Sequence, residues 1–253
     1  MSPQGFWELR LYEMLPRRLP DMHHQFAHEV PPLFERAGVP APLAYWDCFA
    51  GPMTAMLAYI LHWPDLDERM AAWGRFYADP QWWKQYEDAH GGGQMLERSH
   101  VLILRASPAW HTAVCSDPPA TGLHELRMVD LLPQAAGAAH EALARVDLAC
   151  INAHGGRTLG LFDQLAGQRL PRAVSLIAWP DLATRNAAWD AHAADAAVQA
   201  ARAQERRAHG APLVGSAEAH LLRPTAYGAC RPLSGVQSAN CSDSTDMRPS
   251  LPN

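Results

Sequence analysis

The sequence lacks the cysteine pattern of a disulfide framework or of a zinc ribbon. Its five cysteines are odd in number, widely spaced, and form no CxxC pair. Small domains that depend on disulfides, and zinc sites built on paired cysteines, therefore do not fit. The sequence also has no basic N-terminus followed by an apolar stretch, so a secretory signal is not predicted. We expect a reduced protein of the cytoplasm.

Long apolar runs and clusters of basic residues are also missing. No stretch of about 18 or more apolar residues occurs, so no membrane-spanning helix is predicted. Basic residues number 21 against 26 acidic ones, and no basic stripe is present that would bind phosphates. We expect neither a membrane nor a nucleic acid as partner. The expected partners are a small-molecule substrate or ligand and a second copy of the chain in a homodimer.

Sequence motifs for common cofactors and nucleophiles are absent. There is no GxGxxG motif, no P-loop and no GxSxG motif, so we expect no cofactor. His24 and His28 lie four residues apart on a predicted helix and have the spacing of a metal-ligand pair. The apolar stripe of that helix contains Met22, Phe26 and Val30, which places both histidines on the outer face. We therefore expect a solvated helix face there and no metal site.

The sequence does contain an internal repeat. Three groups of residues return in the same order and at nearly the same spacing: Glu8–Arg10 as Glu125–Arg127, Trp63–Leu66 as Trp179–Leu182, and Arg69, Ala72 and Trp73 as Arg185, Ala188 and Trp189. One match of this kind could arise by chance, but the ordered set indicates a tandem duplication.

Each copy is predicted to fold as strand, helix, strand, strand, helix, strand. In the first copy, hydrophobic periodicity predicts strands at 6–12, 43–49, 55–63 and 99–105, and helices at 17–37 and from 65 to about 77. In the second copy, the corresponding ranges are 123–130, 135–149, 158–164, 172–179, 181–208 and 217–223. Gly38 is a plausible end for the first helix, and Asp65 can cap the second. This order is the ferredoxin-like, split βαβ arrangement of an α+β protein.

The repeat gives a domain organisation. We predict a first repeat at 5–106, a linker at 107–121, a second, degenerate repeat at 122–224 and a polar, disordered tail at 225–253. A four-stranded sheet with helices on one face needs a cover for its other face. The two copies can cover each other and form an α/β barrel within one chain, with helices outside. Alternatively, each copy pairs with a copy from a second chain.

The first copy carries a recognisable set of motifs. They are Glu8-Leu9-Arg10 with Tyr12, the Tyr45-Trp46 strand, Asp65-Leu66 with Arg69, the Asp79-Pro80 turn with Trp82, and the closing strand at 102–104. With these motifs, residues 6–106 resemble the NIPSNAP family of the dimeric α/β barrel superfamily. The second copy keeps two of the motifs but has Ala196–Val198 where the first has Pro80–Trp82.

The resemblance implies a dimeric-α/β-barrel-type fold more firmly than a reaction. Neighbouring families of this superfamily include cofactor-free monooxygenases, small-ring isomerases, and proteins that bind or degrade haem. Since one fold supports many chemistries, three hypotheses remain. The first is a cofactor-independent oxygenase, isomerase or cyclase acting on a small apolar or aromatic metabolite. The second is a non-catalytic module that binds a ligand or a protein, and the third is a haem-binding protein.

Candidate catalytic residues follow first from the alternation of strand one. Glu8 and Arg10 share one face, and we expect the leucines of the other face to meet the helices. Glu8 and Arg10 then point into the space between the sheets, as a base and an anion anchor. The alternative is a structural ion-pair network across the pseudo-twofold axis, in which Glu8 meets Arg127 and Glu125 meets Arg10.

Aromatic and histidine residues supply the other candidates. The remaining predicted catalytic residues are Tyr59, His62 and His100, and the predicted ligand-binding residues are Tyr12, Tyr45, Trp46, Trp82 and Arg127. Polar and aromatic side chains concentrate in the first copy, which indicates that a single pocket would take its lining from that half. The alternative is that the aromatic residues fill core and that each histidine is a hydrogen-bonded core residue.

Overall fold

The computed structural model describes residues 3–84, 93–115, 122–228, 231 and 233. In these residues, strands form a closed antiparallel barrel in the order β1-β3-β2-β8-β5-β7-β6-β4. The strands are β1 Phe6–Met14, β2 Ala44–Ala50, β3 Met56–Trp63, β4 Leu96–Ala106, β5 Leu123–Leu131, β6 Arg157–Ala166, β7 Arg172–Trp179 and β8 Val214–Pro224. The mixed α+β class predicted from the sequence is confirmed.

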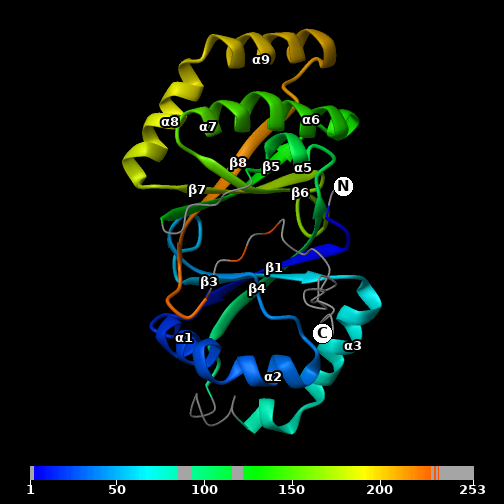
Figure 1. Cartoon of the computed structure of the whole chain (residues 1–253), viewed down its shortest axis with the longest axis vertical. Helices are drawn as coiled ribbons and strands as arrows, with labels where there is room; N and C mark the ends of the chain where they lie inside the picture. Colours follow the sequence, from blue (N-terminus) through cyan, green and yellow to red (C-terminus); the bar gives the residue numbers. More distant parts are fainter. Residues whose placement is uncertain (1–2, 85–92, 116–121, 229–230, 232, 234–253) are drawn as a thin grey trace, which may run out of the picture.

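Helices cover the two ends of the molecule, with the barrel between them (Figure 1). The helices of the first half are α1 Leu19–His28, α2 Val30–Ala37 and α3 Leu66–Ala78. Those that follow are α5 Trp110–Ala113, α6 Ala136–Ala142, α7 Ala149–Ala153, α8 Leu182–Ala194 and α9 Ala196–His209, with a 3₁₀ turn at Pro133–Ala135 and a π-helical segment η2 at Leu143–Leu148. Among the described residues, no helix combines the length and the apolarity that crossing a bilayer requires.

The strand order repeats in the two halves. The first half is ordered β4-β1-β3-β2 and the second half, in the same direction, β8-β5-β7-β6. The halves join where β2 pairs with β8 and where β4 pairs with β6, both antiparallel. Each half thus uses its two edge strands to close the sheet, which satisfies backbone groups that an open edge would leave unpaired. The barrel closes within one chain, and it does so without strands from a second chain.

The predicted helix boundaries are set by caps and by proline. Asp65 accepts a hydrogen bond from the backbone N–H of Glu68 at 2.8 Å and caps α3, as predicted. Gly38 ends α2 in the left-handed conformation at φ 73°. The single helix predicted over 17–37 is wrong in its middle, because α1 ends at His28 and α2 begins at Val30. Two prolines follow Val30 directly, and neither has an N–H to continue the helix.

The barrel interior is filled with apolar side chains from both halves. Trp7, Leu9 and Leu11 of β1 belong to this core, together with residues of β5, β6 and β7. Trp110 also lies there, stacked on Trp7 with 5.6 Å between ring centroids. Trp110 comes from α5, a short helix within the segment predicted as linker. The centre of the barrel is therefore a packed core, not a cavity.

The predicted direction of the β1 side chains is wrong. Glu8, Arg10 and Tyr12 face the helices of the first half, and the leucines between them face the barrel interior. Nearly the whole strand is buried, so the alternation of hydrophobicity does not distinguish its two faces. The decisive factor is the supply of hydrogen-bond donors, which come from α3 and β3 on the helix side.

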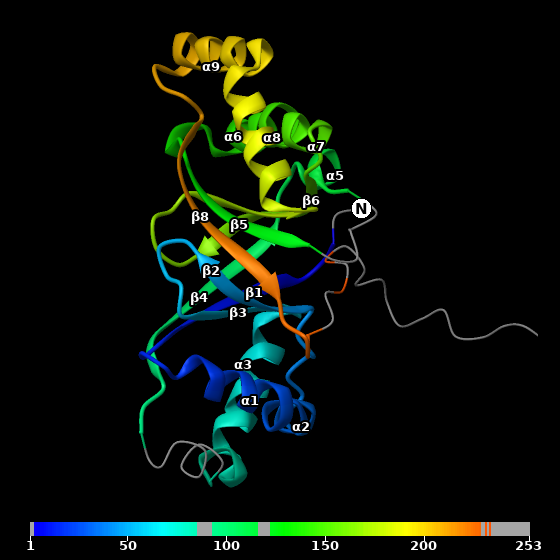
Figure 2. The ribbon, with the colours of Figure 1, turned by 90° about the vertical axis from the view of Figure 1, so that its left-hand side faces the viewer.

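The chain beyond β8 returns to the first half. Tyr227 donates to or accepts from Nδ1 of His23 at 2.8 Å, and Leu233 is buried in the barrel core. Both fall within 225–253, the stretch predicted as a disordered tail. Apart from 225–228, 231 and 233, that stretch lies outside the described residues. Figure 2 shows β8 running from the second-half helices down to the first half.

Candidate functional site

The repeated Glu-Leu-Arg motif forms a buried ion pair in each half. The Glu8 carboxylate is fully buried and accepts two hydrogen bonds from Arg69, at 2.8 and 2.9 Å. It also accepts the indole N–H groups of Trp63 and Trp73, at 2.9 and 3.1 Å. The carboxylate of Glu8 is therefore saturated with donors, and it lines none of the cavities described below.

The second half repeats this arrangement. Glu125 accepts two hydrogen bonds from Arg185, at 2.8 and 3.0 Å, and one each from Trp179 and Trp189, both at 3.1 Å. Burial alone would raise the pKa of Glu125, but Arg185 and the charge of Arg127 lower it below its ordinary value. In both halves, Glu8 and Glu125 take their bidentate arginine from the same half, so the alternative of pairs across the pseudo-twofold axis is wrong for these carboxylates.

An aromatic cavity of about 240 Å³ lies between the helices and the outer face of β1 and β3 in the first half. We call it the first-half cavity. Its lining is almost entirely aromatic and apolar: Tyr12, Met22, Gln25, Phe26, Val30, Phe34, Tyr59, Trp73, Phe76, Tyr77, Trp82, Trp83, Met95 and Leu96. Concave, mostly apolar spaces with a few convergent polar groups are typical of small-molecule sites. Its size favours a ligand at the small end of the usual range.

Two tyrosine hydroxyls meet at the wall of this cavity. The oxygens of Tyr12 and Tyr59 lie 2.9 Å apart in a buried hydrogen bond. One hydroxyl of such a pair donates to the other, so one O–H remains able to donate to a ligand. Burial raises the pKa of both Tyr12 and Tyr59 above the ordinary value, and both are therefore neutral donors at physiological pH.

The Arg10 guanidinium lies behind the tyrosine pair. Its central carbon is 4.2 Å from the centroid of the Trp73 ring and 5.5 Å from that of Tyr12. Nε and Nη1 of Arg10 are buried without a hydrogen bond to any described residue, and Nε is 3.7 Å from the Glu8 carboxylate. Glu8 is shared with Arg69, so two cations face one carboxylate. A net positive charge therefore remains next to the tyrosine hydroxyls.

Gln25 adds a second polar group to the first-half cavity. Its side chain is buried, and its Nε2 atom has no hydrogen-bond partner among residues 3–84, 93–115, 122–228, 231 and 233. An unsatisfied buried amide costs stability unless a ligand or solvent completes it. Gln25 comes from α1, opposite the tyrosine pair on β1 and β3. The cavity thus has polar side chains on β1, β3 and α1 and aromatic rings elsewhere.

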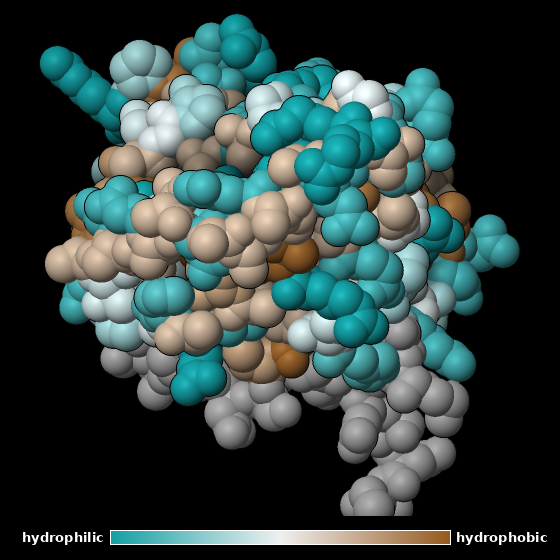
Figure 3. Space-filling view, turned by 90° about the horizontal axis from the view of Figure 1, so that it is seen from above, coloured by the Kyte–Doolittle hydropathy of each residue, from teal (hydrophilic) through white to brown (hydrophobic). Residues whose placement is uncertain are grey.

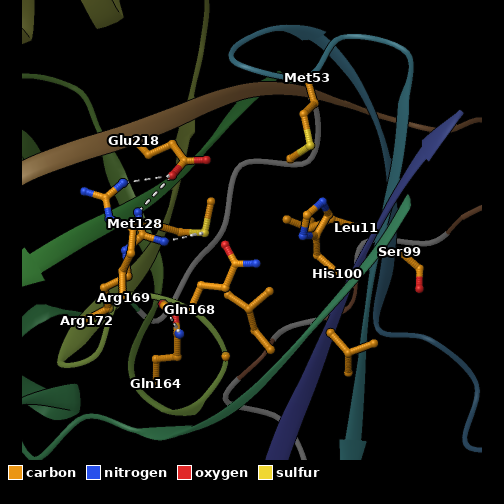
Figure 4. A pocket seen from close by; sticks show the side chains of 13 residues that line it. Leu11, Met53, Ser99, His100, Met128, Gln164, Gln168, Arg169, Arg172 and Glu218 are labelled. Carbon is orange, nitrogen blue, oxygen red and sulfur yellow. Dashed lines mark hydrogen bonds and ion pairs between the residues drawn. The ribbon is translucent and has the colours of Figure 1, made fainter. Parts of the chain in front are cut away.

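A second cavity, of about 330 Å³, opens at one mouth of the barrel. In Figure 4, Gln164, Arg172 and Glu218 of the second half gather on one side, and His100 of the first half lies on the other. Arg172 donates to Glu218 and to Asp130, both at 2.9 Å. Charged groups here are thus largely paired with one another. This cavity lacks the aromatic side chains and the Arg10 group predicted for the space between the sheets.

The remaining predicted site residues are dispersed. Tyr45 packs its ring against Tyr59 with 5.6 Å between centroids, but it lines a different surface groove. Trp46 lies in the barrel core, where its indole N–H donates to His124 at 2.8 Å. His62 bonds the backbone carbonyl of Gln4 at 2.7 Å. Arg127 lines a cavity in the second half. Tyr12, Tyr59 and Trp82 are therefore the predicted residues that meet in one cavity.

Several cavity residues were missed because they lie on helices. Phe26, Trp73 and Phe76 carry much of the aromatic lining, and their helical spacing is that of ordinary core residues. The signal that could have found them is Gln25, a polar residue within the buried face of its helix. His24 and His28 are exposed on the outer face, as predicted.

Comparison with known proteins gives a family match for most of the chain. The family model described as NIPSNAP matches residues 7–109 and again 124–229. No curated protein sequence matches the chain significantly.

Solved structures share the fold at low sequence identity. An anthrone oxidase-like protein superposes with a TM-score of 0.56 at 14% identity, covering 94% of this chain and 99% of its own. A putative chlorite dismutase gives 0.51 at 13% identity, covering 89% and 96%. A NIPSNAP-like domain protein from Burkholderia xenovorans gives 0.36 at 19% identity, covering 46% of this chain and 90% of its own. The first two show that the barrel architecture occurs in other single chains of similar extent.

Proposed function

Because the chain belongs to the NIPSNAP family and carries two copies of its domain, we propose that the first-half cavity binds a small aromatic metabolite that has an acidic oxygen. The observation that carries this proposal is the Tyr12–Tyr59 hydroxyl pair set into an aromatic wall. Rings supply apolar and stacking contacts for a planar ligand. The spare tyrosine O–H selects a phenol, enol or ketone oxygen at one end of it.

The chemistry that this geometry favours is stabilisation of an oxyanion. When a phenol or enol loses its proton, the negative charge on its oxygen is stabilised by the tyrosine donor and by the uncompensated charge of Arg10. Arg10 lies behind Tyr12 and Trp73 and acts through its charge, without lining the cavity. Oxyanion formation is the shared first step of cofactor-free oxygenation and of isomerisation or cyclisation next to a carbonyl.

The ligand must itself be fairly acidic. In the part of the chain that the structure describes, the lining of the first-half cavity contains no carboxylate and no histidine. The proton of the ligand therefore leaves to solvent, not to a dedicated base. The same lining provides no axial imidazole for haem, so the haem hypothesis receives no support from this cavity. We assign Glu8 a structural role, because its carboxylate is saturated with donors.

The name of one structural neighbour suggests a test compound. That neighbour is called anthrone oxidase-like, and an anthrone is a fused aromatic ketone whose enol is acidic. Oxidation of its methylene group to a carbonyl uses one dioxygen as the oxidant and releases one water. We extend this class of compound to the present chain only as a proposal.

Binding is tested with a matched pair of ligands, 1-naphthol and naphthalene, by fluorescence titration. Tyr59→Phe keeps the ring and removes the hydroxyl. We expect it to weaken 1-naphthol about three- to tenfold, the effect of one neutral hydrogen bond, and to leave naphthalene unchanged. Tyr45→Phe, a phenol lost outside the cavity, serves as the control and should change neither. Equal loss of both ligands, or no binding of 1-naphthol, would contradict the proposal.

Turnover separates the enzyme from the non-catalytic binding module. Anthrone is added to the protein in air, and dioxygen consumption is followed with an electrode. Consumption that falls in Tyr59→Phe supports the oxygenase. If 1-naphthol binds but dioxygen consumption stays at the uncatalysed rate, the result supports a non-catalytic module that binds the same class of ligand in the first-half cavity.

A further inference from the structure

A third cavity, of about 180 Å³, lies in the second half at the position equivalent to the first-half cavity. We call it the second-half cavity. The strand register places Ser175 opposite Arg127, as it places Tyr59 opposite Arg10. Trp189 lies under the Arg127 guanidinium at 3.9 Å, as Trp73 lies under that of Arg10. The two cavities are thus built on the same frame by the duplication.

The lining of the two cavities differs in chemistry. Ser175 replaces the aromatic Tyr59, and His192, three residues after Trp189, replaces Phe76, three residues after Trp73. The second-half cavity further includes Asp147, on the π-helical segment η2. Single-turn π segments are rare and often occur at functional sites. An aromatic site in one half therefore corresponds to a polar site in the other.

Two buried polar atoms of this lining have no partner in the part of the chain that the structure describes. Ser175 is 1% exposed and its Oγ makes no hydrogen bond there, and Asp147 is 5% exposed and its Oδ2 makes none. The other oxygen of Asp147, Oδ1, is bonded to Nε2 of His192 at 2.8 Å and to Arg202. Buried polar groups in native proteins are nearly always satisfied. Both residues line the second-half cavity, so a small shift of either side chain would bring its unsatisfied oxygen into contact with a ligand there.

The charges around the second-half cavity form two poles. Arg127 and Arg185 share the single carboxylate of Glu125, which leaves one positive charge at Arg127. Asp147 and Glu205 share the single guanidinium of Arg202. Arg127 is only partly buried and makes its hydrogen bond to Glu125 with one nitrogen, Nη1, at 3.1 Å. The other two nitrogens of its guanidinium group, Nε and Nη2, have the spacing that matches the two oxygens of a carboxylate.

We propose that the second-half cavity binds a small organic acid that carries a hydroxyl or an ammonium group. Its carboxylate lies at Arg127, its hydroxyl or ammonium donates to Oδ2 of Asp147, and the Ser175 hydroxyl completes the contact. The second-half cavity has fewer aromatic rings in its lining than the first-half cavity, and its volume is smaller, about 180 against 240 Å³. This inference is independent of the function proposed for the first-half cavity, since the two sites share no lining residue.

The test uses a matched series of three-carbon acids, followed by saturation-transfer NMR titration. Propionate has the carboxylate alone, L-lactate adds a hydroxyl and L-alanine adds an ammonium group. The four-carbon 3-hydroxybutanoate and the three-carbon β-alanine cover a wider spacing of the two groups. At least one of the acids with a donor should bind about tenfold tighter than propionate, because a hydrogen bond to a charged carboxylate is among the strong ones. The preferred donor identifies the hydroxyl or the ammonium class.

Two variants assign the binding to this cavity. Arg127→Gln should weaken the preferred acid about tenfold or more, and Ser175→Ala about three- to tenfold. Their matched controls are Arg206→Gln and Ser99→Ala, which remove the same groups at exposed positions and should leave the affinity unchanged. The proposal is overturned if no acid with a donor binds better than propionate, or if Arg127→Gln and Ser175→Ala bind as the unchanged protein does while their circular dichroism shows them folded.

Discussion

Replacing Glu8 by glutamine removes a charge from the first half while keeping the size of the side chain. In the folded protein, this carboxylate is fully buried and accepts four hydrogen bonds. The variant leaves the buried Arg10 and the partly buried Arg69 near one another without a counter-charge. Breaking a buried ion pair by removing one partner costs about 3–5 kcal/mol, a large share of the roughly 5–15 kcal/mol that stabilises a typical domain.

The assay is equilibrium unfolding in urea, followed by fluorescence. With an m-value of about 3 kcal/mol/M, the expected loss moves the midpoint down by about 1–1.7 M. Glu125→Gln should cost at least as much, because Arg127 lies closer to Glu125, at 3.1 Å, than Arg10 lies to Glu8, at 3.7 Å. Glu97→Gln, at an exposed position, is the control and should stay within about 0.5 kcal/mol.

The result that would refute this reasoning is specific. A loss below about 1 kcal/mol for both Glu8→Gln and Glu125→Gln would mean that neither carboxylate is the buried, saturated group described above. Unchanged stability combined with loss of 1-naphthol binding in Glu8→Gln would restore the original hypothesis that Glu8 faces a ligand.

Two further predictions concern the barrel core. Burial lowers the pKa of His124 from 6.5 to about 4. Between these pH values, the unfolded chain binds a proton at His124 and the folded protein does not. The free energy of unfolding should therefore be highest above pH 6.5 and fall by about 3 kcal/mol as the pH drops from 6.5 to 4. Urea titrations at several pH values check this, and a flat profile in that window that is the same in His124→Gln would contradict it. Trp110→Ala empties the space that this buried ring fills beside Trp7 and Phe162 and should cost about 3–5 kcal/mol. A change in the free energy of unfolding below about 1 kcal/mol in the same assay would show that the Trp110 ring does not fill the barrel core.

The sequence predicts the repeat and the order of strands and helices along the chain, because these depend on local periodicity and on the duplication. Whether the barrel closes within one chain or between two chains stayed open, because that depends on contacts between strand edges. The Asp65 cap and the Gly38 helix end were predictable for the same reason, since each is set by one residue type at one position. The break between α1 and α2 was readable too, from the two prolines that follow Val30. These features need no knowledge of what packs against them.

The direction of the β1 side chains could not be read in that way. A strand buried on both faces has no polar side. The face of the sheet on which Glu8 lies depends on hydrogen-bond donors that are 55 to 65 residues away in the sequence. The aromatic cavity poses the same difficulty. Its walls come from β1, β3, β4, helices α1 to α3 and the segment with Trp82 and Trp83, and each residue alone resembles core. Tyr12, Tyr59 and Trp82 were identified because the sequence concentrates aromatic residues in the first copy, which is a property of composition and not of contact.

The duplication itself explains how one chain came to have two unlike cavities. In each half, the Glu–Arg ion pair and two tryptophans are retained, and they fix strand, helix and guanidinium relative to one another. Trp73 and Trp189 of that framework also line the cavities, but other lining positions, such as Tyr59 and Ser175, make no bond to the Glu–Arg pair. They can therefore change from aromatic to polar without disturbing the barrel, whose core lies on the other face of the sheet. Each half therefore keeps a common framework at one side of its cavity and varies the remaining lining, so each half can acquire its own specificity.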